Sequence, residues 1–131
     1  MKLAVDTNVL VRALVQDDPV QARIAAKILT DAELIAVALP CLCELVWVLR
    51  KVYGYSSADV AAAIRALFAA GNVVMNRPAV EAGLTVLDAG GDFADGAIAY
   101  EANWLGGEIF VSFDREAVAL LAAQGKTVRL L

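Results

Sequence analysis

Four carboxylates occupy positions where the surrounding residue types and spacing favour chemistry. Asp6 ends an apolar run that predicts a first strand, and Asp114 directly follows the apolar run 108–113. Glu44 interrupts an otherwise apolar stretch, and Asp95 lies inside a segment with helical spacing. A carboxylate among apolar neighbours must be paired, bound to a cation or near water. These four acids are therefore the first candidates for a functional site.

The chemistry of such a set depends on its convergence at one edge of a sheet, where ligands of parallel sheets bind. Two ionised carboxylates about 5 Å apart repel by about 3 kcal/mol at an effective dielectric constant of ~20. Because folding stability is only about 5–15 kcal/mol, a four-acid cluster requires a cation or shared protons. Oxygen ligands without imidazole or thiolate favour Mg²⁺ or Mn²⁺. A metal of this kind polarises phosphodiesters, so the set favours hydrolysis of nucleic acid.

Each acid also has an ordinary structural explanation. Asp6 and Asp114 stand at strand-to-helix junctions, where aspartate often caps the helix. Glu44 could form a salt bridge with Arg50, Lys51 or another basic residue. These alternatives remain open from the sequence.

A further pair of acids, Asp92 and Asp95, lies three residues apart at the start of one predicted helix. Carboxylates are common there because the helix N-terminus carries partial positive charge. Asp92 fits that explanation better. Asp95 lies one turn further in and is followed by apolar residues, so it is the stronger functional candidate.

The composition excludes several classes of mechanism. The 131 residues contain no histidine, which removes imidazole-dependent nucleophiles and histidine-ligated zinc. The two cysteines, Cys41 and Cys43, are too few for a zinc site, and we expect plain buried thiols. The net charge of −4 argues against a broad basic surface for nucleic acid, so phosphate contacts must be local. The candidates are Arg12, Arg50, Lys51 and Arg115.

Short apolar runs alternate with helical segments along the whole chain, which predicts an α/β fold. Short connections imply right-handed crossovers and a mostly parallel sheet covered on both faces. Pro40 is expected to end the second strand, Gly54 to cap the helix that follows, and 108–113 to be buried. The predicted strands are 2–6, 33–40, 72–76, 108–113 and 126–131, and the predicted helices are 8–15, 18–30, 41–54, 56–71, 78–91, 92–107 and 114–125.

Length and hydrophobicity predict one soluble domain, residues 1–131, that self-associates. No long uncharged apolar run and no signal peptide is apparent, so a cytoplasmic protein without membrane contact is expected. The hydrophobic share of 60% exceeds what one small core can hold. Some apolar residues, including Trp47 and Trp104, should therefore cover a partner surface.

Three segments in order resemble the PIN domain of VapC-type toxins, which belong to bacterial and archaeal toxin–antitoxin pairs. AVDTNVLVR (4–12) is similar to the opening motif, CELVWVLRKVYG (43–54) to the segment with the central glutamate, and DFADGAIAYEANWLGGEIFVSFDREA (92–117) to the closing acidic block. The resemblance implies a three-layer α/β/α fold with a central, mostly parallel sheet of four to five strands. It also implies an Mg²⁺- or Mn²⁺-dependent endoribonuclease that acts on RNA, forms a homodimer and is inhibited by an antitoxin protein.

The resemblance also assigns roles to individual residues. Asp6, Glu44 and Asp95 match the three main metal-binding and catalytic acids, and Asp114 matches a fourth. The supporting positions are Thr7, Asn8, Ser112 and, as a supporting or capping residue, Asp92.

Two residues depart from the family pattern. Gly96 stands where a larger helix former is common, which should cost the helix about 1 kcal/mol relative to alanine and loosen the site. Ser112 replaces a threonine but keeps the hydroxyl group.

Two other functions remain possible from the sequence: a PIN-like binding or regulatory module with little catalysis, or an aspartate-based phosphotransfer domain. The complete set of acids argues against the first. The second predicts a lysine at a late strand end, where this chain has Ser112 and Asp114.

Overall fold

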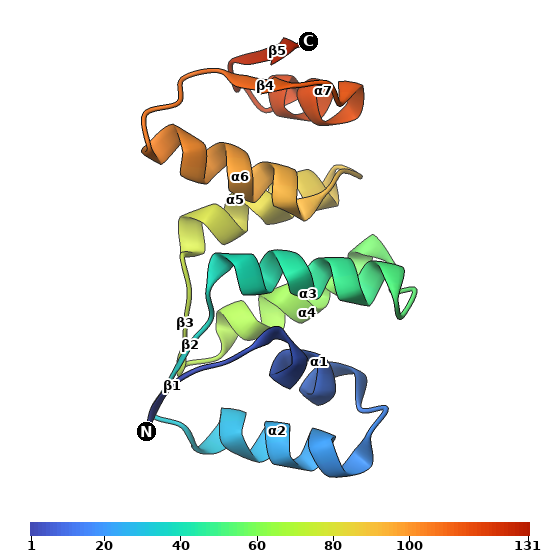
Figure 1. Ribbon diagram of the computed structural model, residues 1–131, viewed down its shortest axis with the longest axis vertical. Helices are drawn as coiled ribbons and strands as arrows, with labels where there is room; N and C mark the ends of the chain where they lie inside the picture. Colours follow the sequence, from blue (N-terminus) through green and yellow to red (C-terminus); the bar gives the residue numbers. More distant parts are fainter. The chain divides into compact units, whose positions relative to one another are not determined.

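A computed structural model describes all residues from Met1 to Leu131 (Figure 1). The chain forms two compact units, Met1–Asn76 and Arg77–Leu131, which are described separately. Both units combine helices with parallel strands, which confirms the predicted α/β class. None of the helices has the length and hydropathy that a membrane span requires.

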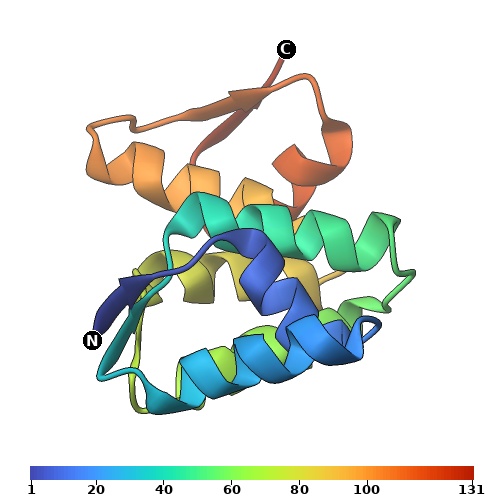
Figure 2. The same cartoon turned by 60° about the horizontal axis from the view of Figure 1, so that its bottom comes forward.

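The first unit contains a parallel sheet in the order β1-β2-β3, with Leu3 opposite Ile35 and Ile35 opposite Val73. Its helices follow the strands along the chain, and α1 lies against both α2 and α3 (Figures 1 and 2). The bounds are β1 Lys2–Ala4, α1 Thr7–Val15, α2 Pro19–Asp31, β2 Leu34–Ala36, α3 Leu39–Lys51, α4 Ser57–Ala69 and β3 Val73–Val74.

The core of the first unit comes from the apolar stripes of its helices and from the central strand. Ile35 of β2 is completely buried, and the α3 residues at helical spacing, Leu42, Leu45 and Leu49, are buried with it. Burial of each such side chain contributes about 1.5–3 kcal/mol. The opposite face of α3 is exposed to solvent, so this helix is buried on one side only.

The second unit pairs two helices with a two-stranded parallel ladder, β4-β5, in which Val111 lies opposite Arg129. Helices α5 and α6 pack closely together, and Phe93 of α6 is fully buried. Figure 2 shows the extended β4 and β5 of this unit beside each other. The bounds are α5 Arg77–Asp88, α6 Phe93–Trp104, β4 Phe110–Ser112, α7 Arg115–Ala123 and β5 Val128–Leu130.

The number of strands in a sheet differs from the prediction. Five strands form, but three are hydrogen-bonded in one sheet and two in another, so no sheet has four or five strands. β4 also differs from the buried strand expected at 108–113, because Val111 is half-exposed and Phe113 is 81% exposed. Successive side chains of β4 point to opposite faces of the β4-β5 ladder, and Val111 lies on the more exposed face while Phe110 and Ser112 are partly buried.

Two boundary predictions are corrected around α3. Pro40 does not end the preceding strand, because β2 stops at Ala36 and Pro40 lies in the first turn of α3. Proline is well tolerated there, since its missing N–H has no partner in the first turn of a helix. Gly54 adopts a left-handed φ of 69°, but the residue at the helix end is Val52.

Gly96 has a packing role that the sequence did not reveal. A Cβ atom at this position would overlap the carbonyl oxygen of Ala82 on α5, so only glycine allows the two helices to approach this closely. This packing role adds to the expected cost in helix propensity, and the effect of Gly96 on the site stays a prediction. The glycine sacrifices helix propensity and permits the tight α5–α6 contact instead.

Candidate active site

The end of β1 places Asp6 at the N-cap of α1. Its backbone is extended, with φ −82° and ψ 160°, and its Oδ1 accepts a hydrogen bond from the Thr7 N–H at 2.8 Å. Asp6 is exposed. One carboxylate oxygen therefore serves the helix, and the other remains available to a ligand.

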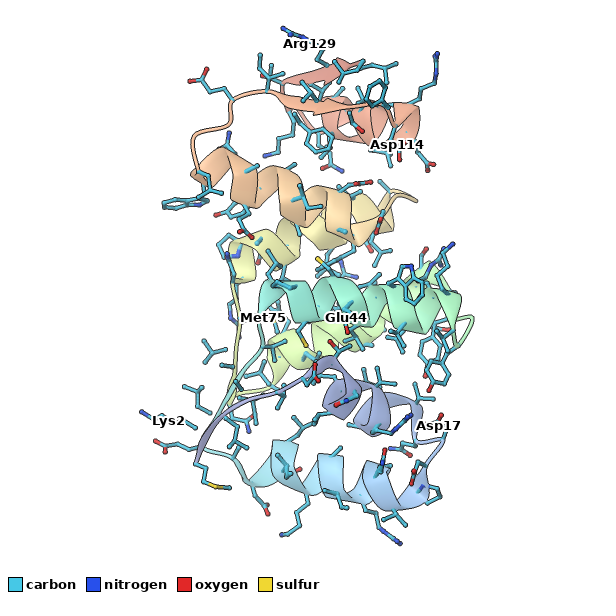
Figure 3. All side chains as sticks on the ribbon, in the orientation of Figure 1. Lys2, Asp17, Glu44, Met75, Asp114 and Arg129 are labelled. Atoms are coloured by element: carbon cyan, nitrogen blue, oxygen red, sulfur yellow. The ribbon has the colours of Figure 1, made fainter.

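Glu44 projects from the exposed side of α3 (Figure 3). It forms no ion pair with Arg50 or Lys51, so the salt-bridge explanation does not hold. The helix periodicity that buries Leu45 and Leu49 carries Glu44 to the solvent side, which removes the cost of an unpaired buried charge.

A buried contact joins the two elements that carry Asp6 and Glu44. Thr7, only 5% exposed, donates its hydroxyl hydrogen to the Cys41 Sγ at 3.5 Å, and the thiol lies 3.9 Å from the Val5 carbonyl oxygen. Burial raises the pKa of the Cys41 thiol, and the charges of Asp6 and Glu44 raise it further. Both carboxylates therefore lie close enough to the Cys41 thiol for their charges to act on it.

Cys41 is a buried free thiol, as expected, while Cys43 is partly exposed. The position of Cys41 one turn before Glu44 was visible in the sequence. Its contact with Thr7 was not, because nothing local connects residues 34 positions apart.

In the second unit, two of the acids cap helices. Asp92 accepts from the Ala94 N–H at 3.1 Å at the start of α6. Asp114 accepts from the N–H groups of Glu116 and Ala117 at 3.0 and 3.1 Å, both through Oδ1. The capping explanation therefore describes both residues, but Oδ2 of Asp114 is left for another partner.

The predicted polar supporting residues have different environments. Ser112 accepts a hydrogen bond from the Asp114 N–H at 2.9 Å, so its hydroxyl holds the turn that presents Asp114. Thr7 is committed to the buried contact with Cys41. Asn8 is exposed on α1.

Asp95 is half-buried in the first turn of α6, and its pKa is raised. Burial is the main cause, and the negative charges of Asp92, Asp114 and Glu116 add to it. In the second unit these three acids are therefore close enough to Asp95 for their charges to raise its pKa. Glu116 was missed in the sequence, although its place in the same first turn as Asp114 could have identified it.

The donors of both units suit a hard divalent cation, because every candidate ligand is a carboxylate oxygen. No group of three or more histidine, cysteine or acidic side chains is close enough to enclose a metal ion. Mg²⁺ does not require such a cage, since it keeps several waters and is usually bound by one or two carboxylates together with substrate phosphates. In the first unit the candidate ligands of this kind are Asp6 and Glu44.

The basic side chains that could contact phosphate differ in their availability. Arg12 is occupied by Asp17 and Tyr53, at 2.9 and 3.3 Å, and also bonds to Gln21. Arg50 is held by the Ser57 Oγ at 2.9 Å. The two predicted candidates that remain exposed without such bonds are Lys51 and Arg115.

The model of the PIN domain family matches residues 3–122, nearly the whole chain, and the protein therefore belongs to the PIN domain family. No curated protein matches the chain. PIN domains are generally nucleases that use divalent metals. Membership of this family therefore supports a nucleic-acid hydrolase.

Proposed function

We propose that the protein is an Mg²⁺- or Mn²⁺-dependent endoribonuclease, the toxin of a VapBC-type toxin–antitoxin pair. The observation that carries most weight is Glu44, an exposed acid without an ion pair on a helix whose other face is apolar. The negative charges of Glu44 and Asp6 both raise the pKa of the Cys41 thiol. The PIN family match supports a nuclease, and the three sequence segments that resemble VapC support the toxin class.

The proposed metal ligands are Asp6 and Glu44 in the first unit and Asp95 and Asp114 in the second. The proposed supporting residues are Thr7, Asn8, Asp92 and Ser112. A bound divalent ion would supply positive charge to the scissile phosphodiester and its leaving oxygen. The protein residues bind and orient that ion. The single free oxygen of Asp6 and of Asp114 suits this role, because capping the helix fixes the direction of the other oxygen.

The proposal extends to partners. The acidic net charge of −4 suits an antitoxin with basic side chains, and many large apolar residues are exposed, including Trp104, Leu105 and Phe113. Such surfaces commonly cover a partner chain. We therefore propose a homodimer inhibited by a cognate antitoxin, with cytoplasmic RNA as the substrate.

The catalytic assignment predicts the effect of Glu44→Gln. This change keeps the shape of the side chain but removes its charge, so cleavage of a defined RNA in Mg²⁺ or Mn²⁺ should fall by at least about 100-fold, more than loss of an outer-sphere partner costs. The melting temperature in metal-free buffer should stay equal or rise, because repulsion with Asp6 is relieved. Mapping of the cut ends on gels measures the rate and the site.

Glu33→Gln is the matched control, since Glu33 is an exposed glutamate of the same unit outside the site. It should cut RNA at the wild-type rate. Normal cleavage by Glu44→Gln would make the assignment wrong. RNA binding without cleavage in either metal would instead favour the binding module, and a phosphorylated Asp6 would favour phosphotransfer.

A further inference from the structure

Aromatic and basic residues gather at the end of α3 and in the turn after it. Three of the chain's five tryptophan and tyrosine residues lie within nine positions: Trp47, Tyr53 and Tyr55. Arg50 and Lys51 lie between them, in the last turn of the helix. Interleaved aromatic and basic residues are typical of surfaces that bind single-stranded nucleic acid.

The helix places Trp47 in line with the proposed catalytic acid. Trp47 follows Glu44 by three residues and precedes Lys51 by four, so the three side chains share one face of α3. All three are exposed, and Trp47 is 59% exposed. With a rise of about 1.5 Å per residue, Trp47 lies about 4.5 Å and Lys51 about 10.5 Å along the axis from Glu44.

Neither the Trp47 indole nor the Lys51 ammonium group forms a hydrogen bond or ion pair within the protein. The other tryptophan, Trp104, donates its indole N–H to the Tyr100 hydroxyl at 2.8 Å, whereas the Trp47 indole has no hydrogen bond. Lys51 forms no ion pair, while its neighbour Arg50 bonds to Ser57. The exposed face of α3 thus presents a free aromatic ring and a free positive charge.

We infer that Trp47 stacks on an unpaired base of the substrate and that Lys51 contacts a phosphate of the same strand. This inference rests on the proposed function, which puts the scissile phosphate near Glu44. The base on Trp47 would then belong to a nucleotide close to the cut. Positive charge on this face complements a polyanion, and Glu44 is the only acidic residue of α3. A second copy of the chain is the competing occupant.

Binding affinity tests the inference separately from cleavage. Fluorescence anisotropy of a labelled single-stranded RNA is measured in the Glu44→Gln background, where the strand stays intact. Trp47→Ala should weaken binding by about 5- to 150-fold, the range for loss of one stacked base, and Trp47→Phe should retain most of the affinity. Lys51→Ala should reduce the slope of log affinity against log salt concentration by about 0.7. Trp104→Ala, which removes the other exposed tryptophan, should bind as its parent does.

The outcomes separate the two proposals. Unchanged affinity of Trp47→Ala would overturn the stacking inference and leave the nuclease proposal intact. Loss of binding by Trp47→Ala in a protein whose wild type never cuts RNA would uphold stacking and overturn the nuclease. A change from dimer to monomer in light scattering, with unchanged affinity, would show that Trp47 covers a second copy and would overturn the inference. Circular dichroism confirms that each exposed-site variant is folded.

Discussion

At the residue scale, two of the four proposed metal ligands also cap helices. Asp6 and Asp114 cap α1 and α7 through one carboxylate oxygen each. Because the caps satisfy N–H groups at helix ends, they stabilise the fold and also orient the free oxygens. Replacement of either residue is therefore expected to affect stability and metal binding together, whereas Glu44 has no structural bond to lose and gives a cleaner test.

A polar network fastens the loop after α1 to the residues that follow α3. The Tyr53 hydroxyl donates to the Asp17 Oδ2 at 3.0 Å, and Arg12 lies 2.9 Å from the Asp17 Oδ1. The pKa of Asp17 is lowered, mainly by the bond from Tyr53 and further by Arg12. The ionised form of Asp17 is thus favoured in the folded state.

This network predicts a pH-dependent effect of Tyr53→Phe. A carboxyl group whose pKa is depressed on folding contributes stability above its ordinary value near 3.8, and that stability is lost as pH falls through the folded pKa. The melting temperature of Tyr53→Phe should therefore lie below that of the wild type at pH 7, and the difference should shrink below about pH 3.8. Thermal melts from pH 2.5 to 7, on the order of the range where aspartate titrates, measure this.

Tyr55→Phe is the matched control, because no hydrogen bond of the Tyr55 hydroxyl is seen and its backbone carbonyl receives Arg50 instead. Its melting temperature should follow the wild type at every pH. A Tyr53→Phe deficit of constant size across the range would contradict a role through Asp17.

At the scale of elements, the α5–α6 pair shows how glycine positions decide packing. Gly96 faces the backbone of Ala82, and Gly83 faces the ring of Phe93, so each helix has a small residue where the other comes close. Since Asp92 and Asp95 lie in the first turn of α6 or just before it, this contact also sets where those acids are presented.

Gly96→Ala should consequently lower the free energy of unfolding by about 1–3 kcal/mol, the usual cost of overpacking. Alanine favours a helix by about 1 kcal/mol over glycine, so a loss would show that the close contact outweighs propensity. Urea denaturation measures it. Gly71→Ala serves as the control, because a Cβ at Gly71 meets nothing within 4 Å. A neutral or stabilising Gly96→Ala would mean that α5 and α6 are less tightly packed.

At the scale of the molecule, the acids are divided between the two units. Asp6 and Glu44 belong to Met1–Asn76, and Asp95 and Asp114 to Arg77–Leu131. The family match from residue 3 to 122 includes both units. Candidate metal ligands therefore occur in each unit, and an ion that binds only the folded protein should stabilise it.

Metal should raise the melting temperature. Mn²⁺ at about 100 times its dissociation constant adds about 2.7 kcal/mol of stability, a rise on the order of 10 °C. Glu44→Gln and Asp114→Asn should each reduce that rise, while Glu33→Gln should not. Calorimetric melts with and without Mn²⁺ measure this. A rise that only Glu44→Gln reduces would confine the metal to the first unit, and no rise at all would contradict the metal site.

The sequence alone predicts the features that depend on residues close to one another along the chain. Caps were predictable because a residue such as Ser56 bonds to a group three positions away, the Asp59 N–H. The order of strands and helices, the α/β class and the segments that resemble the PIN family were likewise readable from local spacing. The exposure of Glu44 is also consistent with local spacing, because Leu42, Leu45 and Leu49 form a buried stripe that does not include it.

Only the tertiary structure decided the features that depend on contacts distant along the chain. These are the division of the strands into ladders of three and two, the contact of Thr7 with Cys41, the use of Arg12 by Asp17 and Tyr53, and the approach of Gly96 to Ala82. Periodicity shows which side of an element is apolar. It does not show which partner meets that side, because packing is decided by shape and by polar groups that become neighbours only when the chain has folded.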